Sequence, residues 1–141
     1  MPYARNAGGE TMTNSEPIFR KLRAILEKHA GALSVTNDTP DRYCLEGNVG
    51  PATVKAWGGK VKRPTIPIAW VEIGKSYVSY HLMAVYGNAP LTASMSTKLK
   101  ARMQGKTCFN FTTEDTALFA ELEHLTAKGL ASFRKAGFIS D

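Results

Sequence analysis

The sequence predicts an α+β fold in which an antiparallel sheet carries an N-terminal and a C-terminal helix on one face. Amphipathic helical patterns stand near both ends of the 141-residue chain, and short β-rich segments separated by Gly, Asn and Pro lie between them. Runs of strands between flanking helices are typical of a sheet covered on one face. The length fits one domain, which we expect over residues 14–141. Residues 1–13 are small and polar and predict a flexible tail, with either Met1 or Met12 as the start.

The first expected element is a helix over residues 18–30. Asn14 or Ser15 offers an N-cap, and Gly31 ends the helix. The apolar residues recur at helical spacing and form one stripe: Ile18, Leu22, Ile25 and Leu26. We therefore expect this helix to lie on an apolar surface.

Four strands are expected next, over residues 41–47, 52–57, 65–74 and 76–86. The last has the strongest signal, because its alternation separates two faces. One face would carry Val78, Tyr80, Leu82, Ala84 and Tyr86. The other would carry Tyr77, Ser79, His81, Met83 and Val85. This second set mixes polar and apolar residues, which suits a half-covered sheet face or the wall of a cleft.

Three elements complete the prediction: a short helix over residues 94–104, a strand over 108–111 and a long helix over 114–136. Gly105 and Gly137 follow the two helices and are expected to end them. Thr112 or Thr113 would cap the long helix.

The positive charge of the chain is concentrated in its middle. The net charge is +6, and residues 55–106 contain Glu72 as their only acid. The basic residues in this stretch are Lys55, Lys60, Lys62, Arg63, Lys75, Lys98, Lys100, Arg102 and Lys106. Such a field favours an anionic partner, whether nucleotide, phosphorylated metabolite or nucleic acid. The alternative is a solvated basic face without a partner.

Several classes of protein are not expected. No apolar run approaches the length of a membrane span, and the N-terminus lacks the apolar core of a secretory signal, so we expect a cytoplasmic protein that does not bind membranes. Cys44 and Cys108 show neither a disulfide framework nor a zinc spacing and are expected to be buried thiols. No metal or other cofactor is predicted, since the three histidines are scattered.

Two tripeptides resemble the end of a phosphate-binding loop, Gly74-Lys75-Ser76 and Gly105-Lys106-Thr107. The full motif needs an earlier glycine, where this chain has Ala69 and Lys100, and it opens a helix rather than a strand. We therefore reject both. No nucleophile, base and orienting group stand out together, so an enzyme is less expected than a binding protein.

The candidate binding residues lie on the strongest strand and on the segment over residues 102–111. They are Tyr80, His81, Tyr86, Arg102, Lys106 and Cys108. His81 is either a satisfied half-buried residue or part of a site. Cys108 is either a buried thiol or one whose pKa Lys106 lowers.

The segments over residues 77–86 and 99–111 together resemble the YdhG-like domain family of bacterial proteins, which shares an aromatic-His strand followed by a Gly-Lys-Ser/Thr-Cys segment. The resemblance covers residues 15–139 and implies a frataxin-like two-layer α+β sandwich. It also brings in iron delivery as a role, although the first helix carries Glu16 and Glu27 among basic residues rather than an acidic ridge.

Three functions follow from these observations. The first is a binding module whose basic cleft near Arg102, Lys106 and the His81 strand holds a small anionic ligand or an acidic protein partner. An alternative is nucleic-acid binding through residues 55–106, with Trp57, Trp70 and tyrosines stacking on bases. Frataxin-like iron delivery is the third.

Overall fold

The computed structural model describes residues 15–141, and the tail expected over residues 1–13 lies outside them. The helices are α1 (Ser15–Glu27), α2 (Pro51–Ala56), α3 (Ala89–Ala93), α4 (Thr97–Lys100) and α5 (Thr116–Ala136), with a 3-10 turn over Met83–Val85. The strands are β1 (Ser34–Thr39), β2 (Arg42–Val49), β3 (Thr65–Ile73), β4 (Val78–Leu82), β5 (Met103–Gln104), β6 (Cys108–Phe111) and β7 (Ile139–Ser140).

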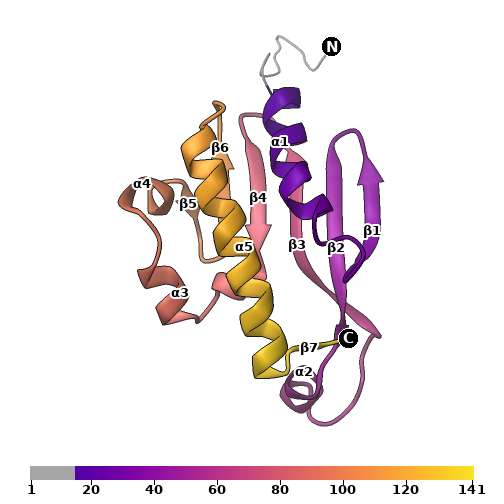
Figure 1. Ribbon diagram of the computed structural model, residues 1–141. Coiled ribbons are helices and arrows are strands. Elements are labelled where there is room, and N and C mark those ends of the chain that lie inside the picture. The colour runs from indigo at the N-terminus through magenta and orange to yellow at the C-terminus, as the bar shows by residue number, and fades with distance from the viewer. Residues whose placement is uncertain (1–14) are drawn as a thin grey trace.

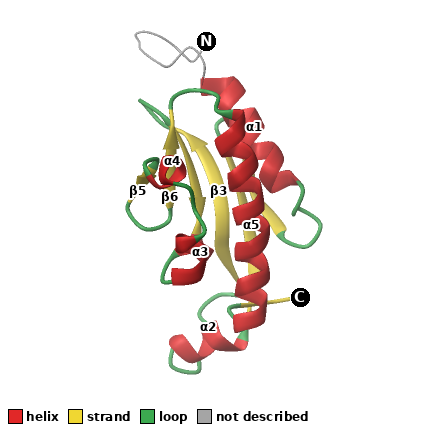
Figure 2. Ribbon diagram, turned by 60° about the vertical axis from the view of Figure 1, so that its left-hand side comes forward, coloured by secondary structure: helices red, strands yellow, loops and turns green. Residues whose placement is uncertain are grey.

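The strands form one antiparallel sheet in the order β1-β2-β3-β4-β6-β5, and β7 adds a short pairing to β2. Both α1 and α5 lie on the same face of this sheet (Figures 1 and 2). The predicted α+β class, with an antiparallel sheet and its terminal helices on one face, is therefore confirmed. No helix of residues 15–141 lies across the opposite face of the sheet in either view.

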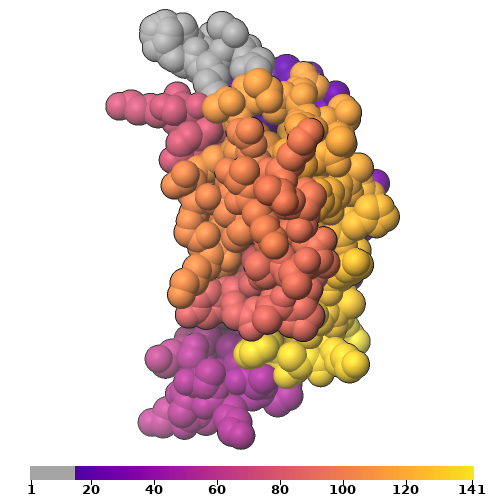
Figure 3. Space-filling model, turned by 90° about the vertical axis from the view of Figure 1, so that its left-hand side faces the viewer, coloured from indigo at the N-terminus to yellow at the C-terminus, as the bar shows by residue number. Residues whose placement is uncertain are grey.

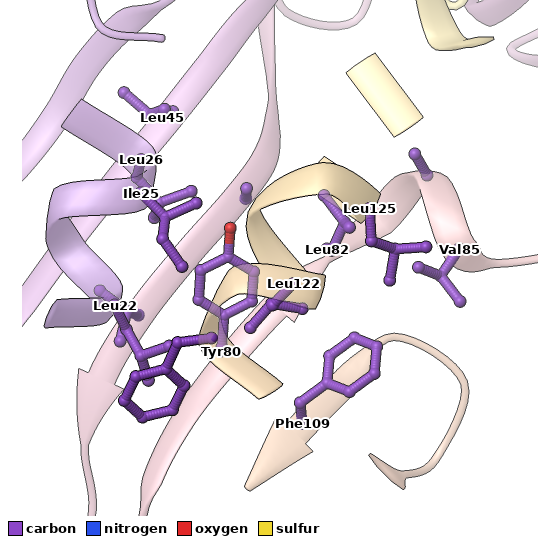
Figure 4. Packing of buried hydrophobic residues seen from close by; sticks show 14 of the residues in the cluster. Leu22, Ile25, Leu26, Leu45, Tyr80, Leu82, Val85, Phe109, Leu122 and Leu125 are labelled. Atoms are coloured by element: carbon purple, nitrogen blue, oxygen red, sulfur yellow. The ribbon is translucent and has the colours of Figure 1, made fainter. Parts of the chain in front are cut away.

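The hydrophobic core fills the space between the two long helices and the sheet (Figure 4). Leu22 from α1, Leu122 from α5 and Phe109 from β6 are fully buried there. One polar contact lies inside this core, where Tyr80 of β4 bonds to Thr126 of α5 at 2.6 Å between the two hydroxyl oxygens. Thr126 donates its own proton to the Leu122 carbonyl, so the Tyr80 hydroxyl is the donor of that short bond.

The ends of α5 agree with the sequence prediction at one end and not at the other. Gly137 occupies the C-cap with φ +83°, a left-handed conformation that suits glycine. The N-cap is Asp115, whose carboxylate accepts a hydrogen bond from the Leu118 amide. The predicted cap at Thr112 or Thr113 was wrong by two to three residues, because an aspartate provides the acceptor directly before the first turn.

Residues 52–57, predicted as a strand, form most of helix α2 instead. Pro51 stands in the first turn of this helix, where its fixed φ favours the helical conformation. The Ala52 amide donates to the Gly137 carbonyl, which ties the start of α2 to the end of α5. The sheet gains a different strand in its place, β1, which is polar and exposed at the sheet edge and was not predicted.

The region between β4 and β6 also differs from the prediction. The single helix expected over residues 94–104 is replaced by α3 and α4, each with its own side-chain cap, from Asn88 and from Ser96. Gly105 has φ +82°, but it lies in the turn between β5 and β6 rather than at a helix end. Strand β4 ends at Leu82, and the 3-10 turn after it interrupts the alternation expected up to Tyr86.

Candidate functional site

Two rows of side chains cross the helix-free face of the sheet. The strand register places one row through Asn37, Cys44, Trp70, His81, Cys108 and Gln104. The second row runs through Thr39, Arg42, Glu72, Ser79 and Asn110. Because residues alternate between the two faces of a strand, the residues between these rows, such as Val71 and Tyr80, point into the core.

Trp70 and His81 form the centre of the first row. Their rings are stacked with centroids 4.5 Å apart and an angle of 11° between the ring planes. Each ring therefore has one face covered by the other. Half-buried Trp70 lies directly beside Cys44 on the neighbouring strand, and Cys44 is almost completely buried.

Glu72 connects the two rows. One carboxylate oxygen lies 3.5 Å from His81 Nε2, and the other lies 3.6 Å from Arg42 Nε. The pKa of His81 is lowered, because burial disfavours the charged imidazolium more than the Glu72 carboxylate favours it. At neutral pH His81 is therefore uncharged, and Glu72 is paired mainly with Arg42.

Cys108 lies beside His81 but is not activated by it. The sulfur is 3.7 Å from His81 Nε2, while the thiol donates to the Asn110 side-chain oxygen at 3.2 Å. Burial raises the pKa of the Cys108 thiol, and Lys106 does not lower it. A neutral thiol next to a neutral imidazole lacks the thiolate that nucleophilic catalysis requires. The Ser79 hydroxyl also donates to Asn110, at 2.9 Å, and so is not aimed at a base.

The structure brings some of the predicted site residues together and separates others. His81 and Cys108 are direct cross-strand neighbours. Arg102 accepts a backbone hydrogen bond from Asn110, which places it on the helix-free face by register. Tyr80 lies on the opposite face in the core and is fully buried, so it is not part of this face.

Tyr86 and Lys106 form a separate pair. The Lys106 ammonium lies 5.3 Å from the centre of the Tyr86 ring, and 60% of Tyr86 is exposed. Such a contact is a weak cation–π attraction at an exposed site. It connects the 3-10 turn after β4 to the turn between β5 and β6.

Unpaired cations surround β5. Of the basic residues over 55–106, Arg63 alone has an ion pair among residues 15–141, with Glu46 at 3.1 Å. Four of the others lie on α4, directly before β5 or in the turn that follows it: Lys98, Lys100, Arg102 and Lys106. All four are exposed, and the segment that carries them lies at the β5 edge of the sheet, on the side that faces the viewer in Figure 3.

Helix α1 shows the opposite arrangement. On α1, Arg20 pairs with Glu16 at 2.9 Å, and Arg23 pairs with both Glu27 and Asp38. Lys21 and Lys28 are paired with acidic residues from the region of α5. Within the described part of the chain, the charge on α1 is therefore neutralised locally, whereas the charge around β5 is not.

The described residues contain neither a metal-ligand cluster nor a membrane-spanning helix. Over residues 15–141, no three His, Cys, Asp or Glu side chains are placed to share a metal ion. Both cysteines are free, and they are separated in the same row by Trp70 and His81. In the same residues, no helix has the length and apolar character that crossing a bilayer would need.

No family model matches the chain, and neither the curated proteins nor the solved structures contain a match to it.

Sequence reasoning missed the polar groups around His81 and Cys108. Glu72, Ser79 and Asn110 stand on three different strands, and only the register between the strands brings them together. The alternation of β4 already placed Ser79 and His81 on one face. The sequence does not show which residues of β3 and β6 lie opposite Ser79 and His81.

Proposed function

We propose that this protein is a binding module for an anionic partner, which it holds at the β5 edge of the sheet. One observation carries the proposal: Lys98, Lys100, Arg102 and Lys106 gather at one edge without an acidic partner among residues 15–141, whereas the basic residues of α1 are all paired. Cations that repel one another and lack a counter-charge attract anions from solution. The adjoining sheet face adds hydrogen-bonding groups from Gln104 and Asn110.

The chemistry of the sheet face supports binding rather than catalysis. Cys108 and His81 are both neutral near pH 7, and the available hydroxyl of Ser79 is bonded to an amide oxygen. A contact surface of this kind needs no activated nucleophile. Its exposed charges favour rapid, salt-sensitive association.

A double substitution tests the proposal. Arg102→Ala with Lys106→Ala is expected to weaken binding of a fluorescent deca-aspartate peptide about tenfold at low salt, since each exposed charge contributes at most about 1 kcal/mol. The matched control is Lys60→Ala with Lys135→Ala, which removes two exposed charges elsewhere that have no ion pair among residues 15–141. Fluorescence anisotropy measures both. If the two variants lose the same affinity for the peptide, the binding depends on net charge alone, and the proposed site is wrong.

Nucleic-acid binding is the second candidate, and a specific observation favours it. Exposed aromatic rings accompany the unpaired cations: Tyr86 contacts Lys106, and Tyr77 follows Lys75 closely in the chain. Proteins that bind single-stranded nucleic acids stack the bases on aromatic rings that lie beside cations. Trp70 contributes less, because His81 covers one face of its ring.

Anisotropy with a labelled oligo-dT strand separates the two candidates. If nucleic acid is the partner, the strand binds more tightly than deca-aspartate at equal salt, and Tyr86→Leu weakens only the strand. If the two polyanions bind alike and Tyr86→Leu changes neither, the stacking role is excluded and the general anionic role stands.

The relationship to YdhG-like and frataxin-like proteins is also a proposal. Two terminal helices against one face of an antiparallel sheet support it. The associated iron-delivery role has less support, because Glu16 and Glu27 on α1 are paired with Arg20 and Arg23. A ferrous titration followed by calorimetry tests this role, and micromolar binding would restore it.

A further inference from the structure

An open cavity lies beside the C-terminal half of α5, on the side of the molecule seen in Figure 3. Its volume is about 430 Å³, which falls in the range of small-molecule sites. Three aromatic side chains line it, Tyr86, Phe133 and Phe138. The cavity therefore offers ring surface on more than one side.

Exposed apolar surface is concentrated at this cavity. Five large apolar side chains are exposed over residues 15–141, and two of them, Tyr86 at 60% and Phe138 at 39%, line the same cavity. Phe138 packs against Phe133 with ring centroids 5.2 Å apart. Large apolar side chains that gather in one hollow, rather than scatter over the surface, mark a binding site for an apolar group.

The polar groups of the cavity wall are hydrogen-bond donors. The Asn88 side-chain oxygen is already occupied by the Leu91 amide, and its nitrogen donates to Ser132 Oγ at 3.1 Å. The Ser132 hydroxyl proton and the second Asn88 amide proton have no acceptor within residues 15–141. A ligand with acceptor atoms satisfies both groups.

A positive charge stands next to the aromatic wall. The Lys106 ammonium is 5.3 Å from the centre of the Tyr86 ring, and Tyr86 lines the cavity. A second cation, Lys128, borders a smaller adjoining depression that shares Asn88, Pro90 and Ser132 with the cavity. Donors and cations together select against a neutral hydrocarbon and favour an anion.

We infer that the cavity binds a flat ring that carries an anionic group, with the ring between Tyr86 and Phe138 and the anion at Lys106. This inference rests on the proposed function, since it names the chemical class of the anion that the β5 edge attracts. The ring provides the apolar contact and accepts hydrogen bonds from Asn88 and Ser132. A nucleotide has all of these features, and so does an aromatic carboxylate.

Calorimetric titration with three related probes tests the inference: AMP, ribose 5-phosphate and adenosine. AMP is expected to bind at least about tenfold more tightly than either of the other two, because only AMP combines a ring with an anion. Indole-3-acetate in place of AMP then distinguishes a carboxylate from a phosphate as the preferred anion. Binding of either ring-bearing anion above ribose 5-phosphate supports the inference.

Three variants and one control test which part of the site each side chain provides. Tyr86→Ala is expected to remove the advantage of AMP over ribose 5-phosphate, and Ser132→Phe, which fills the cavity from α5, should do the same. Lys106→Gln should weaken AMP and ribose 5-phosphate by the same factor, while Lys135→Gln, an exposed and unpaired lysine of α5, changes neither.

The outcomes separate this inference from the proposed function. If AMP and ribose 5-phosphate bind equally well and Lys106→Gln weakens both, the anionic edge stands and the ring site is overturned. If adenosine binds as tightly as AMP, the cavity takes rings without regard to charge, and its link to Lys106 is overturned. If deca-aspartate and all phosphate probes fail to bind, both proposals are overturned.

Discussion

The two faces of the sheet are built from the same strands but carry different kinds of residue. On β4, Tyr80 points into the core and is fully buried, while its neighbours Ser79 and His81 belong to the polar rows of the other face. The alternation along one strand therefore divides the chain into residues that stabilise the fold and residues that are available for contact. Substitutions on the two faces should have correspondingly different effects on the free energy of unfolding.

The two faces should differ most in the free energy of unfolding when substitutions on β6 and on its neighbour β5 are compared. Phe109→Ala removes a fully buried ring from the helix-covered face and should lower the free energy of unfolding by about 3–5 kcal/mol. Gln104→Ala, on the helix-free face and exposed, should change it by less than about 0.5 kcal/mol. Urea denaturation measures both. Similar midpoints for the two variants would contradict the division between the faces.

A smaller effect is expected from the hydrogen bond between Tyr80 and Thr126 inside the core. Tyr80→Phe keeps the buried ring but removes the hydrogen bond to Thr126, so the free energy of unfolding should fall by about 1 kcal/mol. Thr126 keeps its bond to the Leu122 carbonyl, which prevents a larger loss. Burial raises the pKa of Tyr80 strongly, so the ring should not ionise before the protein unfolds in alkali. Ultraviolet titration that shows all tyrosines ionising together in folded protein would contradict this assignment.

The parts of the fold that local pattern determines were predictable, and the parts that depend on distant partners were not. Both long helices and strand β3 have strong periodic or β-rich sequences, and the predicted bounds of α5 and β3 agree with the structure to within two residues. Helix α1 was placed three residues too late, over 18–30 instead of Ser15–Glu27, and it ends before the Gly31 that was expected to end it. Residues 52–57 are rich in β-formers, but Pro51 and the contact with Gly137 make them a helix. Strand β1 is polar because it lies at the exposed edge, so it carries no alternation that a sequence search would find.

The candidate site was predictable to a similar extent. The charge of Arg102 and Lys106 follows from composition, and the sequence placed the His81 strand and the segment over residues 102–111 in one site. The pairing of Cys108 with His81 depends on the register between β4 and β6, which local pattern does not give. Tyr80 is not part of the site, because residues alternate between the two faces along β4 and Tyr80 points away from the face of His81. The sequence already indicated this alternation. The cavity between Tyr86 and Phe138 was not predictable, because it joins a turn after β4 to the end of α5, residues that are distant in the chain.

The smallest expected effect concerns the pH dependence of stability on the helix-free face. The pKa of His81 is lowered from its ordinary value of 6.5 by burial, and the Glu72 carboxylate opposes this shift only in part. The unfolded chain therefore binds a proton at this residue at a pH where the folded protein does not. The contribution of His81 to stability is fully present above pH 6.5, and it is lost as the pH falls below 6.5 towards the folded pKa. His29 shifts in the same direction, so part of the loss remains without His81. Urea midpoints measured between pH 7.5 and 5 should fall less steeply for His81→Gln than for the parent protein. A steeper fall in the variant would mean that Glu72 outweighs burial and that His81 is charged in the folded state.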